Sequence, residues 1–390
     1  MINNEELIKY KTPLYVFNIK TLVDRINYLK SKIDAELVYA IKANTFIAKE
    51  IEPEVSRFEI CSYGEYEICD RLNINPKKML ISGVNKEEEY IEEMIKKHNI
   101  GKYTIESMEH FKILEKLSKK YNKKLNVLIR LTSNNQFGVN EEEFKEIIKK
   151  NKYLIIDGIE FFSGTQKTSL KKINREIDYI YDFVNSIEEE LDFKINEIEY
   201  GLGLPVYYFQ EDEFDEDKFL EEVNNSLEKL RNKRLLIELG RSISASCGSY
   251  ITSVADIKKN KNGYHVILDG GINHLVYYGQ TMAMRIPYFE QYPKRNNNKE
   301  IYTLYGSLCT INDIILKSIE LNKLQIGDYL VFKNTGAYSM TEGISLFLSR
   351  ELPAVIIIDR DGNIKLVRNH IKTSDLNYPN YNEKEWKNYG

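Results

Sequence analysis

Eight short apolar or β-branched runs alternate with longer amphipathic segments rich in lysine and glutamate over the first 245 residues. We expect strands at Leu37–Ile41, Arg57–Cys61, Met79–Ser82, Tyr103–Ile105, Leu125–Leu131, Ile156–Phe162, Glu197–Tyr200 and Leu235–Glu238. Helical spacing is clearest in Leu22–Lys32, Glu65–Leu72, Glu87–Lys96, Glu109–Lys120, Glu141–Lys150, Leu170–Glu190 and Asp217–Arg231. This alternation predicts an α/β fold with a parallel sheet, and eight units are the number that closes a (β/α)8 TIM-type barrel. A doubly wound open sheet is the alternative, because periodicity alone does not show closure.

The pattern changes after about residue 245, where helical spacing thins and strand-like runs follow one another. These runs are Tyr250–Val254, Tyr264–Leu268, Tyr329–Phe332 and Ala354–Ile358, and Asp361-Gly362 is a plausible hairpin turn. They predict a second, antiparallel β domain. The extended segment Pro13–Phe17 could join it, because this segment has no partner within the barrel count. We therefore expect a barrel domain at residues 20–245 and a β domain at residues 1–19 plus 246–390.

Composition indicates a two-domain globular protein. At 390 residues the chain exceeds a usual single core. Hydrophobic residues make up 42% and charged residues 29%, and the net charge of -4 argues against nucleic acid as a partner. The N-terminus lacks the plan of a signal peptide, and no apolar run is long enough for a membrane span. A cytoplasmic protein with no membrane partner is the expectation.

Four cysteines and five histidines are scattered along the chain. They form no pattern typical of zinc ligands, so we expect no dedicated metal site. Disulfides are not expected in a reducing compartment.

Polar residues gather where the predicted strands end, which in a barrel is the active face. They are Lys42, Ser62, Arg130, Ser163–Gln166, Gly201–Gly203 and Glu238–Arg241. One amine, two glycine-containing turns, an arginine and a carboxylate suit a ligand that carries a phosphate and also a cationic group.

Lys42 follows a buried strand, so its amine would lie at the mouth of a pocket. A partly desolvated amine becomes a nucleophile toward an aldehyde, which would allow a Schiff base. The ordinary alternative is a lysine that reaches into water.

The turn Gly201-Leu202-Gly203 could approach a phosphate closely, with Arg241 adding a charge-assisted hydrogen bond. It is not a nucleotide-binding motif, and an ordinary tight turn is the alternative. Glu238 would be repelled by a phosphate, so it makes sense if it faces a cationic atom such as a protonated pyridine nitrogen. The alternative for Glu238 is a structural ion pair with a neighbouring lysine or arginine.

Five segments together carry a family resemblance. They are Tyr39–Asn44, Glu59–Glu65, Glu238–Arg241, Gly306–Asp313 and Gly336–Tyr338. In this order they resemble the motifs of the fold-type III pyridoxal-phosphate decarboxylases, the alanine racemase-like group that contains diaminopimelate, ornithine and arginine decarboxylases. The resemblance runs from about Thr12 to about Arg368.

The resemblance implies a role for each matching residue. Lys42 would bind pyridoxal 5'-phosphate as a Schiff base, and Glu238 would keep the pyridine nitrogen protonated so that the ring withdraws the electrons left on Cα. The phosphate would be held by Gly203, Gly240, Arg241, Tyr338 and, more weakly, Thr165. Cys309 would reprotonate Cα and Asp313 would help to bind the substrate amine, both from a loop that reaches into the neighbouring subunit. A homodimer with shared active sites is thus implied.

Departures from the family pattern concern the cofactor and the substrate. Phe162 stands where a histidine usually stacks on the pyridine ring, Leu202 interrupts the usual triple glycine, and Glu59 replaces a usual aspartate near the cofactor. Diaminopimelate decarboxylases usually carry a glutamate and an arginine where this chain has Thr310 and Tyr277.

A site that lacks this glutamate and this arginine would leave a distal ammonium and carboxylate of the substrate poorly paired. We therefore disfavour diaminopimelate. The Cys309-Thr310 form of the loop instead looks like that of decarboxylases from siderophore and antibiotic pathways, which act on modified or carrier-protein-linked amino acids. Arg285 is a further candidate for binding such a substrate, with a surface arginine as the alternative.

Four alternatives stay open beside a decarboxylase of a modified or carrier-linked amino acid. They are a diaminopimelate decarboxylase of lysine biosynthesis, a barrel-type racemase, an inactive pyridoxal-phosphate-binding protein and a barrel without a ligand.

Overall fold

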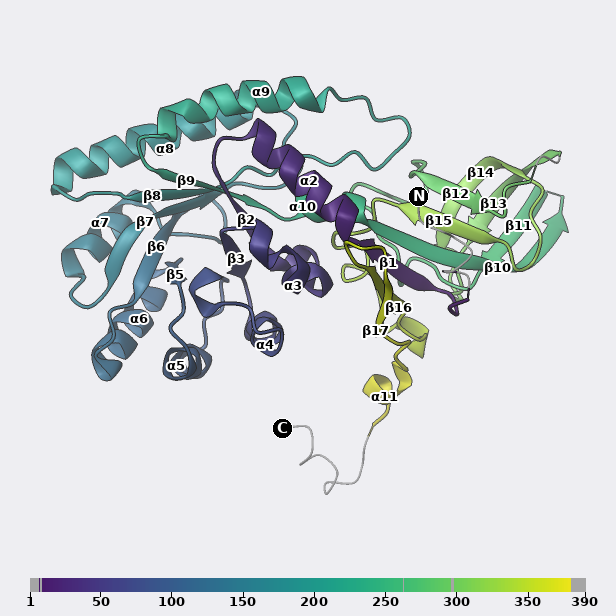
Figure 1. Ribbon diagram of the computed structural model, residues 1–390, viewed down its shortest axis with the longest axis horizontal. Coiled ribbons are helices and arrows are strands. Elements are labelled where there is room, and N and C mark those ends of the chain that lie inside the picture. The colour runs from purple at the N-terminus through teal and green to yellow at the C-terminus, as the bar shows by residue number, and fades with distance from the viewer. Residues whose placement is uncertain (1–6, 8, 262, 296–297, 380–390) are drawn as a thin grey trace. The chain divides into compact units, whose positions relative to one another are not determined.

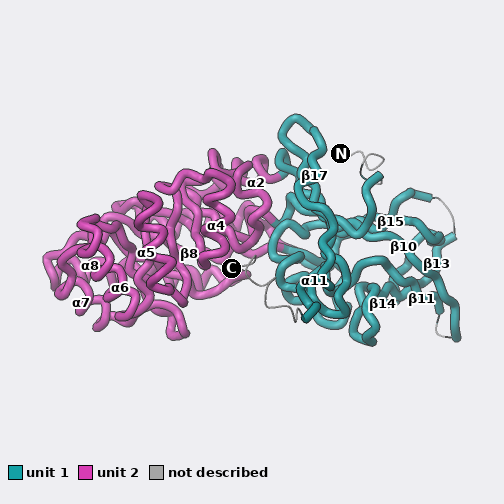
Figure 2. The backbone as a smooth tube through the Cα atoms, turned by 90° about the horizontal axis from the view of Figure 1, so that it is seen from below, with its two compact units in different colours: residues 1–21, 207–213, 245–390 teal, residues 22–206, 214–244 magenta. Residues whose placement is uncertain are grey.

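The structure is a computed structural model that describes residues 7, 9–261, 263–295 and 298–379. The chain forms two compact units (Figure 2). Unit 1 comprises residues 1–21, 207–213 and 245–390, and unit 2 comprises residues 22–206 and 214–244. Residues 207–213 thus belong to unit 1 although barrel elements flank them on both sides in the sequence.

Unit 2 is a closed parallel barrel. Its strands are β2 (Glu36–Ala40), β3 (Arg57–Ile60), β4 (Met79–Ile81), β5 (Lys102–Ile105), β6 (Asn126–Leu131), β7 (Ile155–Phe162), β8 (Glu197–Gly201) and β9 (Arg234–Leu239). Each strand pairs with the next, and β9 pairs with β2, with Glu238 opposite Val38. The predicted barrel is confirmed, and the closing pair overturns the open-sheet alternative.

Amphipathic helices connect these strands and surround them (Figure 1). They are α2 (Ile19–Lys32), α3 (Ala48–Ile51), α4 (Tyr63–Arg71), α5 (Glu88–Lys97), α6 (Met108–Tyr121), α7 (Glu141–Lys150), α8 (Leu170–Leu191) and α9 (Glu216–Leu227). On α8, Ile173, Ile177 and Ile180 are buried at helical spacing. Asn140 and Glu143 form a capping box that starts α7, so local side-chain chemistry sets where this helix begins. The short α10 (Arg241–Ser244) follows β9 directly.

Unit 1 contains a nine-stranded sheet within the described residues. Its strands are β1 (Leu14–Asn18), β10 (Gly248–Asn260), β11 (Gly263–Leu268), β12 (Phe289–Tyr292), β13 (Lys299–Tyr305), β14 (Ile314–Asn322), β15 (Tyr329–Lys333), β16 (Ala354–Ile358) and β17 (Ile364–Arg368). A short helix, α11 (Ser374–Asn377), follows them. Leu14, Val16, Ile251, Val331 and Ile356 form part of the core under this sheet.

The N-terminal segment joins this sheet as predicted. β1 pairs antiparallel with β10 and parallel with β16. β11 and β13 are also parallel, so the sheet is mostly antiparallel rather than wholly so. Parallel neighbours need a long connection between them, and most of the chain separates β1 from β16. The predicted turn at Asp361-Gly362 is confirmed: it connects the antiparallel strands β16 and β17, and Gly362 has a φ of 90°. No helix of the described residues has the length and apolar character to cross a membrane.

Candidate active site

Lys42 lies directly after β2, in a single turn of 3-10 helix at Ile41–Ala43. Ile41 and Ala43 on either side of it are buried, whereas 39% of the lysine side chain is exposed. Its Nζ lies 2.7 Å from Oε2 of Glu59 and 4.0 Å from Oε1 of Glu238. Glu59 lies on β3 and Glu238 on β9, the two neighbours of β2 in the barrel. Barrel closure therefore puts one carboxyl on each side of this amine.

The two carboxyls at Lys42 have opposite pKa shifts. Both are buried, Glu59 with 1% and Glu238 with 7% of the residue exposed. Burial, together with the negative charge of Glu59, raises the pKa of Glu238 well above its ordinary value. Burial would also raise the pKa of Glu59, but the Lys42 ammonium and a hydrogen bond with Glu238 lower it. Glu238 therefore keeps a proton while Glu59 is ionised and paired with Lys42.

A third carboxyl, that of Glu160 on β7, completes this group. The carboxylate oxygens of Glu59, Glu160 and Glu238 lie within 4.8 Å of one another. Nη1 of Arg130 lies 3.4 Å from Glu160, but neither Glu160 oxygen has a hydrogen-bond partner among the described residues. Burial is the main cause that raises the pKa of Glu160. Two cations, Lys42 and Arg130, thus face these three carboxyls, and Arg130 also contacts Glu106 at 3.2 Å.

The ends of β7, β8 and β9 are in register at this edge of the barrel. Phe162 lies opposite Gly201, and Gly201 lies opposite Glu238. A Cβ atom on Gly201 would lie 2.3 Å from the Phe162 ring, so the two residues are in direct contact. Leu202, which interrupts the expected triple glycine, is fully buried. Its side chain is accommodated in the core instead of projecting into an open cavity.

The turn after β8 approaches the loop after β7 very closely. Gly203 has a φ of 63°, and a Cβ on it would lie 2.2 Å from the carbonyl oxygen of Gly164. Glycine is required at this position for both reasons. Thr165 is exposed in the same β7 loop, and Arg241 is buried directly after Gly240 at the start of α10. This edge therefore offers a close backbone approach and an arginine, the groups that bind a phosphate.

The remaining predicted residues lie in unit 1. Cys309 is an exposed, free thiol in the loop between β13 and β14. Asp313 in the same loop has only 1% of its surface exposed, and its carboxylate accepts the backbone N–H groups of Leu308 at 2.7 Å and Ile272 at 2.9 Å. One oxygen is thus engaged within its own loop and the other by Ile272, which follows β11. This geometry favours a structural role for Asp313 over the predicted contact with a substrate amine.

The three candidates for the substrate side have different surroundings. Thr310 lines a pocket of about 620 Å³ in unit 1 together with residues 343–347. Tyr277 is buried and donates its hydroxyl to the carbonyl of Lys333 at 2.7 Å.

Arg285 is an anchored arginine. It pairs with Glu211 at 2.7 Å and with Asp212, and its guanidinium lies 4.0 Å from the Phe209 ring centroid. The surface-arginine alternative therefore holds only in part, because this guanidinium is already bound within unit 1.

Tyr338, predicted to bind the phosphate, has a left-handed backbone with a φ of 63°. Its carbonyl accepts the N–H groups of Thr341 and Glu342 at 2.8 and 3.0 Å. These bonds fix its backbone within unit 1.

Comparison with known proteins decides the family. The family model described as pyridoxal-dependent decarboxylase, pyridoxal binding domain, matches residues 19–245. The chain belongs to the pyridoxal-dependent decarboxylases. Its cofactor is therefore pyridoxal 5'-phosphate, and the predicted fold-type III family is confirmed.

Relatives of this decarboxylase cover nearly its whole length. An L-glutamyl-[BtrI acyl-carrier protein] decarboxylase of Niallia circulans is 26% identical over 94% of this chain and 93% of its own. A diaminopimelate decarboxylase of Helicobacter pylori is 28% identical over 96% of this chain and 97% of its own. The structure of a Methanocaldococcus jannaschii diaminopimelate decarboxylase in complex with L-lysine superposes with a TM-score of 0.83 and 25% identity, covering 98% of this chain and 94% of that one.

The residues of this decarboxylase fit the cofactor. Lys42 supplies an amine beside two carboxyls, and Glu238 has no arginine or lysine partner closer than Lys42, 4.0 Å away, among the described residues. Gly203 has no room for a Cβ, which would lie 2.2 Å from the carbonyl oxygen of Gly164, so this turn is bare backbone that a phosphate can approach. The donor set therefore matches an aldehyde, a pyridine nitrogen and a phosphate.

Sequence reasoning missed two buried charges of the decarboxylase. Glu160 stands within the apolar run of β7, where a charge on an inward position of a strand is the signal that could have revealed it. Lys167 has only 3% of its surface exposed and pairs with Glu176 on α8 at 2.6 Å. No local pattern marks this pair.

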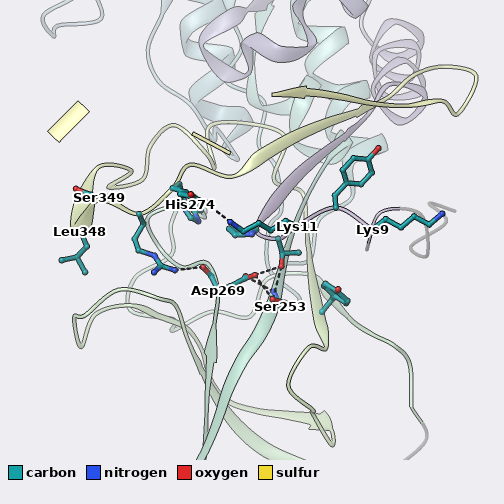
Figure 3. A pocket seen from close by; sticks show the side chains of 13 residues that line it. Lys9, Lys11, Ser253, Asp269, His274, Leu348 and Ser349 are labelled. Atoms are coloured by element: carbon teal, nitrogen blue, oxygen red, sulfur yellow. Dashed lines mark hydrogen bonds and ion pairs between the residues drawn. The ribbon is translucent and has the colours of Figure 1, made fainter. Parts of the chain in front are cut away.

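A further pocket, of about 870 Å³, lies in unit 1 of the decarboxylase (Figure 3). Asp269 in it accepts hydrogen bonds from Thr12, Thr252 and Ser253. The His274 ring is bonded to the carbonyl of Glu351 at 2.8 Å. These contacts attach the segment before β1 to the sheet, which is a structural role.

Proposed function

We propose that this decarboxylase removes the α-carboxyl group of an amino acid whose distal end is modified or linked to a carrier protein. The observation that carries this proposal is that the residues that would meet a distal ammonium and carboxylate are either uncharged or already paired. Tyr277 is neutral and its hydroxyl is engaged, and Arg285 is already paired with two acids. Burying a charged distal group against such residues would cost several kcal/mol, so a neutral amide or thioester linkage fits better.

Two relatives act on substrates of this kind. One is the decarboxylase for glutamate on an acyl-carrier protein, and another, from Staphylococcus aureus, acts on 2-[(L-alanin-3-ylcarbamoyl)methyl]-2-hydroxybutanedioate. The latter enzyme is 25% identical over 88% of this chain and 93% of its own. In the first name the glutamyl group is linked to a carrier protein, and in the second the alanine carries the added group at C3.

When bound, the cofactor withdraws the electron pair that remains on Cα after carbon dioxide leaves. Lys42 would hold the cofactor covalently through Nζ, and Glu59 would keep this amine oriented. Glu238 would pair with the pyridine nitrogen, and Gly203, Gly240, Arg241, Thr165 and Tyr338 would bind the phosphate. Phe162 would pack against the ring through apolar contact alone. Cys309 would donate its Sγ proton to Cα in the partner's site.

The substrate proposal is tested by release of carbon dioxide from a panel of amino acids. The panel contains diaminopimelate, lysine, ornithine, glutamate, a side-chain amide of 2,3-diaminopropionate, and glutamate as a thioester on a carrier protein. We expect kcat/KM for at least one amide or thioester substrate to exceed that for diaminopimelate by about tenfold or more. A preference for free diaminopimelate would overturn the proposal.

Diaminopimelate decarboxylase is the second candidate, because several relatives of similar identity have this activity. A racemase is separated from both by its product, which would be the opposite enantiomer with no carbon dioxide. A protein that binds the cofactor at Lys42, seen by borohydride reduction and mass spectrometry, but converts no substrate of the panel would be an inactive binder.

We also propose a homodimer with shared active sites. Ile311, Ile344, Leu346 and Phe347 are exposed in unit 1, with 88%, 49%, 47% and 43% of their surfaces accessible. Ile311 belongs to the same loop as Cys309. Exposed apolar residues beside a functional loop are typical of an interface.

A cytoplasmic location is part of the proposal, since the four cysteines are all free thiols. Cell fractionation tests it.

A further inference from the structure

Lys167 is a buried cation in the loop after β7 that the proposed mechanism does not use. Its Nζ donates to Oε2 of Glu176 at 2.6 Å and to the carbonyl oxygen of Gly201 at 3.0 Å. A buried lysine is costly unless it is paired and fully hydrogen-bonded. These two contacts pair the charge and use two of the three N–H donors of the ammonium.

Glu176 connects this lysine to its surroundings. It also accepts hydrogen bonds from the hydroxyls of Ser163 at 2.5 Å and Tyr200 at 2.7 Å. Residues from the β7 loop, from β8 and from α8 thus converge on one carboxylate. A second lysine, Lys172, lies 4.0 Å from Glu176 but is 44% exposed, so it adds little to the buried group.

The same lysine holds two carbonyls of the turn after β8. Its backbone N–H donates to the carbonyl of Gly203 at 2.8 Å, while its Nζ binds the carbonyl of Gly201. In a trans peptide unit the C=O and the following N–H point in opposite directions. Attracting both carbonyls toward Lys167 therefore directs the N–H groups of Leu202 and Leu204 away from it. N–H groups of a turn that share one direction can form an anion site, and Gly203 between these two residues is partly exposed.

We propose that Lys167 is a positioning residue for the phosphate of the cofactor, acting through the backbone of the Gly201–Gly203 turn. This inference rests on the proposed assignment of Gly203 to the phosphate. Lys167 does not need to touch the phosphate, because it sets the direction of the peptide units that do. Glu176 keeps the ammonium in place from the other side.

The test compares pyridoxal 5'-phosphate with pyridoxal, which has the aldehyde but no phosphate. The Kd of each for the full-length apoprotein is measured from the absorbance of the adduct with Lys42. In Lys167→Met we expect the affinity for pyridoxal 5'-phosphate to fall by about tenfold or more, with less than about a threefold change for pyridoxal. Lys172→Met, which removes the exposed lysine near the same glutamate, should change neither.

A purely structural role would weaken both ligands equally, and that result would overturn the proposal. So would a Lys167→Met protein that keeps the wild-type preference for the phosphorylated ligand. If Lys167→Met does not fold, Lys167→Gln replaces it, because a neutral amide can still donate a hydrogen bond to Glu176 while the ammonium at the Gly201 carbonyl is lost. The same loss of preference is expected, and its retention overturns the inference. A wild-type protein that binds neither ligand would instead overturn the proposed function.

Discussion

At the scale of single residues, the active face depends on carboxyls that are kept in different protonation states. The pKa of Glu238 is raised well above its ordinary value because it is buried beside Glu59. A cofactor with a protonated pyridine nitrogen would give Glu238 a positive partner, and Glu238 could then ionise. The proton balance of the site is thus coupled to cofactor binding.

Glu238→Gln tests the proposed role of this carboxyl. Glutamine keeps the size of the side chain but cannot supply a negative charge to the pyridine nitrogen. We expect kcat to fall by about 10² to 10³ while the cofactor stays attached to Lys42. Steady-state kinetics and the absorbance of the bound cofactor check this. Glu228→Gln, at an exposed glutamate, should leave kcat unchanged, and an unaltered kcat in Glu238→Gln would contradict the assignment.

Glu199 predicts a pH dependence of stability. Burial, only partly offset by Arg57, raises the pKa of Glu199 from 4.5 to about 7. Below pH 4.5 the carboxyl is protonated in both states. Between pH 4.5 and 7 the unfolded chain loses this proton while the folded chain keeps it, so the free energy of unfolding falls as the pH rises. The contribution is at most about 3 kcal/mol.

Urea denaturation of the apoprotein at several pH values measures this effect. Glu199→Gln should remove part of the fall between pH 4.5 and 7, whereas Glu222→Gln, on the exposed face of α9, should not. Equal slopes in the wild type and in Glu199→Gln would show that another group titrates.

At the scale of elements, the loops after β7 and β8 are the most constrained part of the site. Gly203 has a left-handed backbone, and its Cα faces the carbonyl of Gly164 without room for a Cβ. Any side chain there must separate the two loops, which include the proposed phosphate ligands.

Gly203→Ala should therefore weaken pyridoxal 5'-phosphate binding by about tenfold or more and lower the free energy of unfolding by roughly 1 to 3 kcal/mol. Gly64→Ala is the matched control, because a Cβ there would meet its nearest neighbour, Ser62 Oγ, only at 4.0 Å, within α4. This variant should bind the cofactor normally. Binding titration and chemical denaturation give both values, and normal binding by Gly203→Ala would argue against a phosphate at this turn.

Strand and helix periodicity predicted the eight barrel strands correctly, because most of them are short apolar runs with buried side chains, although β3 and β8 also carry buried charges. The same reasoning could not predict Lys167, whose function depends on Gly201, 34 residues away, and on Glu176, 9 residues away. The role of Asp313 in binding the substrate amine was likewise predicted from a motif alone. Whether this carboxylate faces outward or binds the backbone of Ile272 is decided by a contact between loops that are distant in sequence.

At the scale of the whole molecule, the residues proposed to be catalytic are divided between the two compact units. Lys42 belongs to unit 2 and Cys309 to unit 1. If the active sites are shared between subunits, a Lys42→Ala chain and a Cys309→Ala chain can complement each other.

Random mixing of these two inactive variants should restore about a quarter of the wild-type activity, because half of the dimers are mixed and each has one complete site. Activity after co-refolding, with each variant alone as the control, measures this. No recovery from a mixture that contains mixed dimers would show that Lys42 and Cys309 act within one chain.

The position of β1 between β10 and β16 has a consequence for folding during synthesis. Leu14 pairs with Ile251 on one side and with Ala354 on the other. A ribosome therefore completes every barrel strand before it makes either partner of the first strand. β1 stays without any partner strand until β10 has emerged, and without its second partner until β16 has, which leaves an apolar segment for a chaperone to protect.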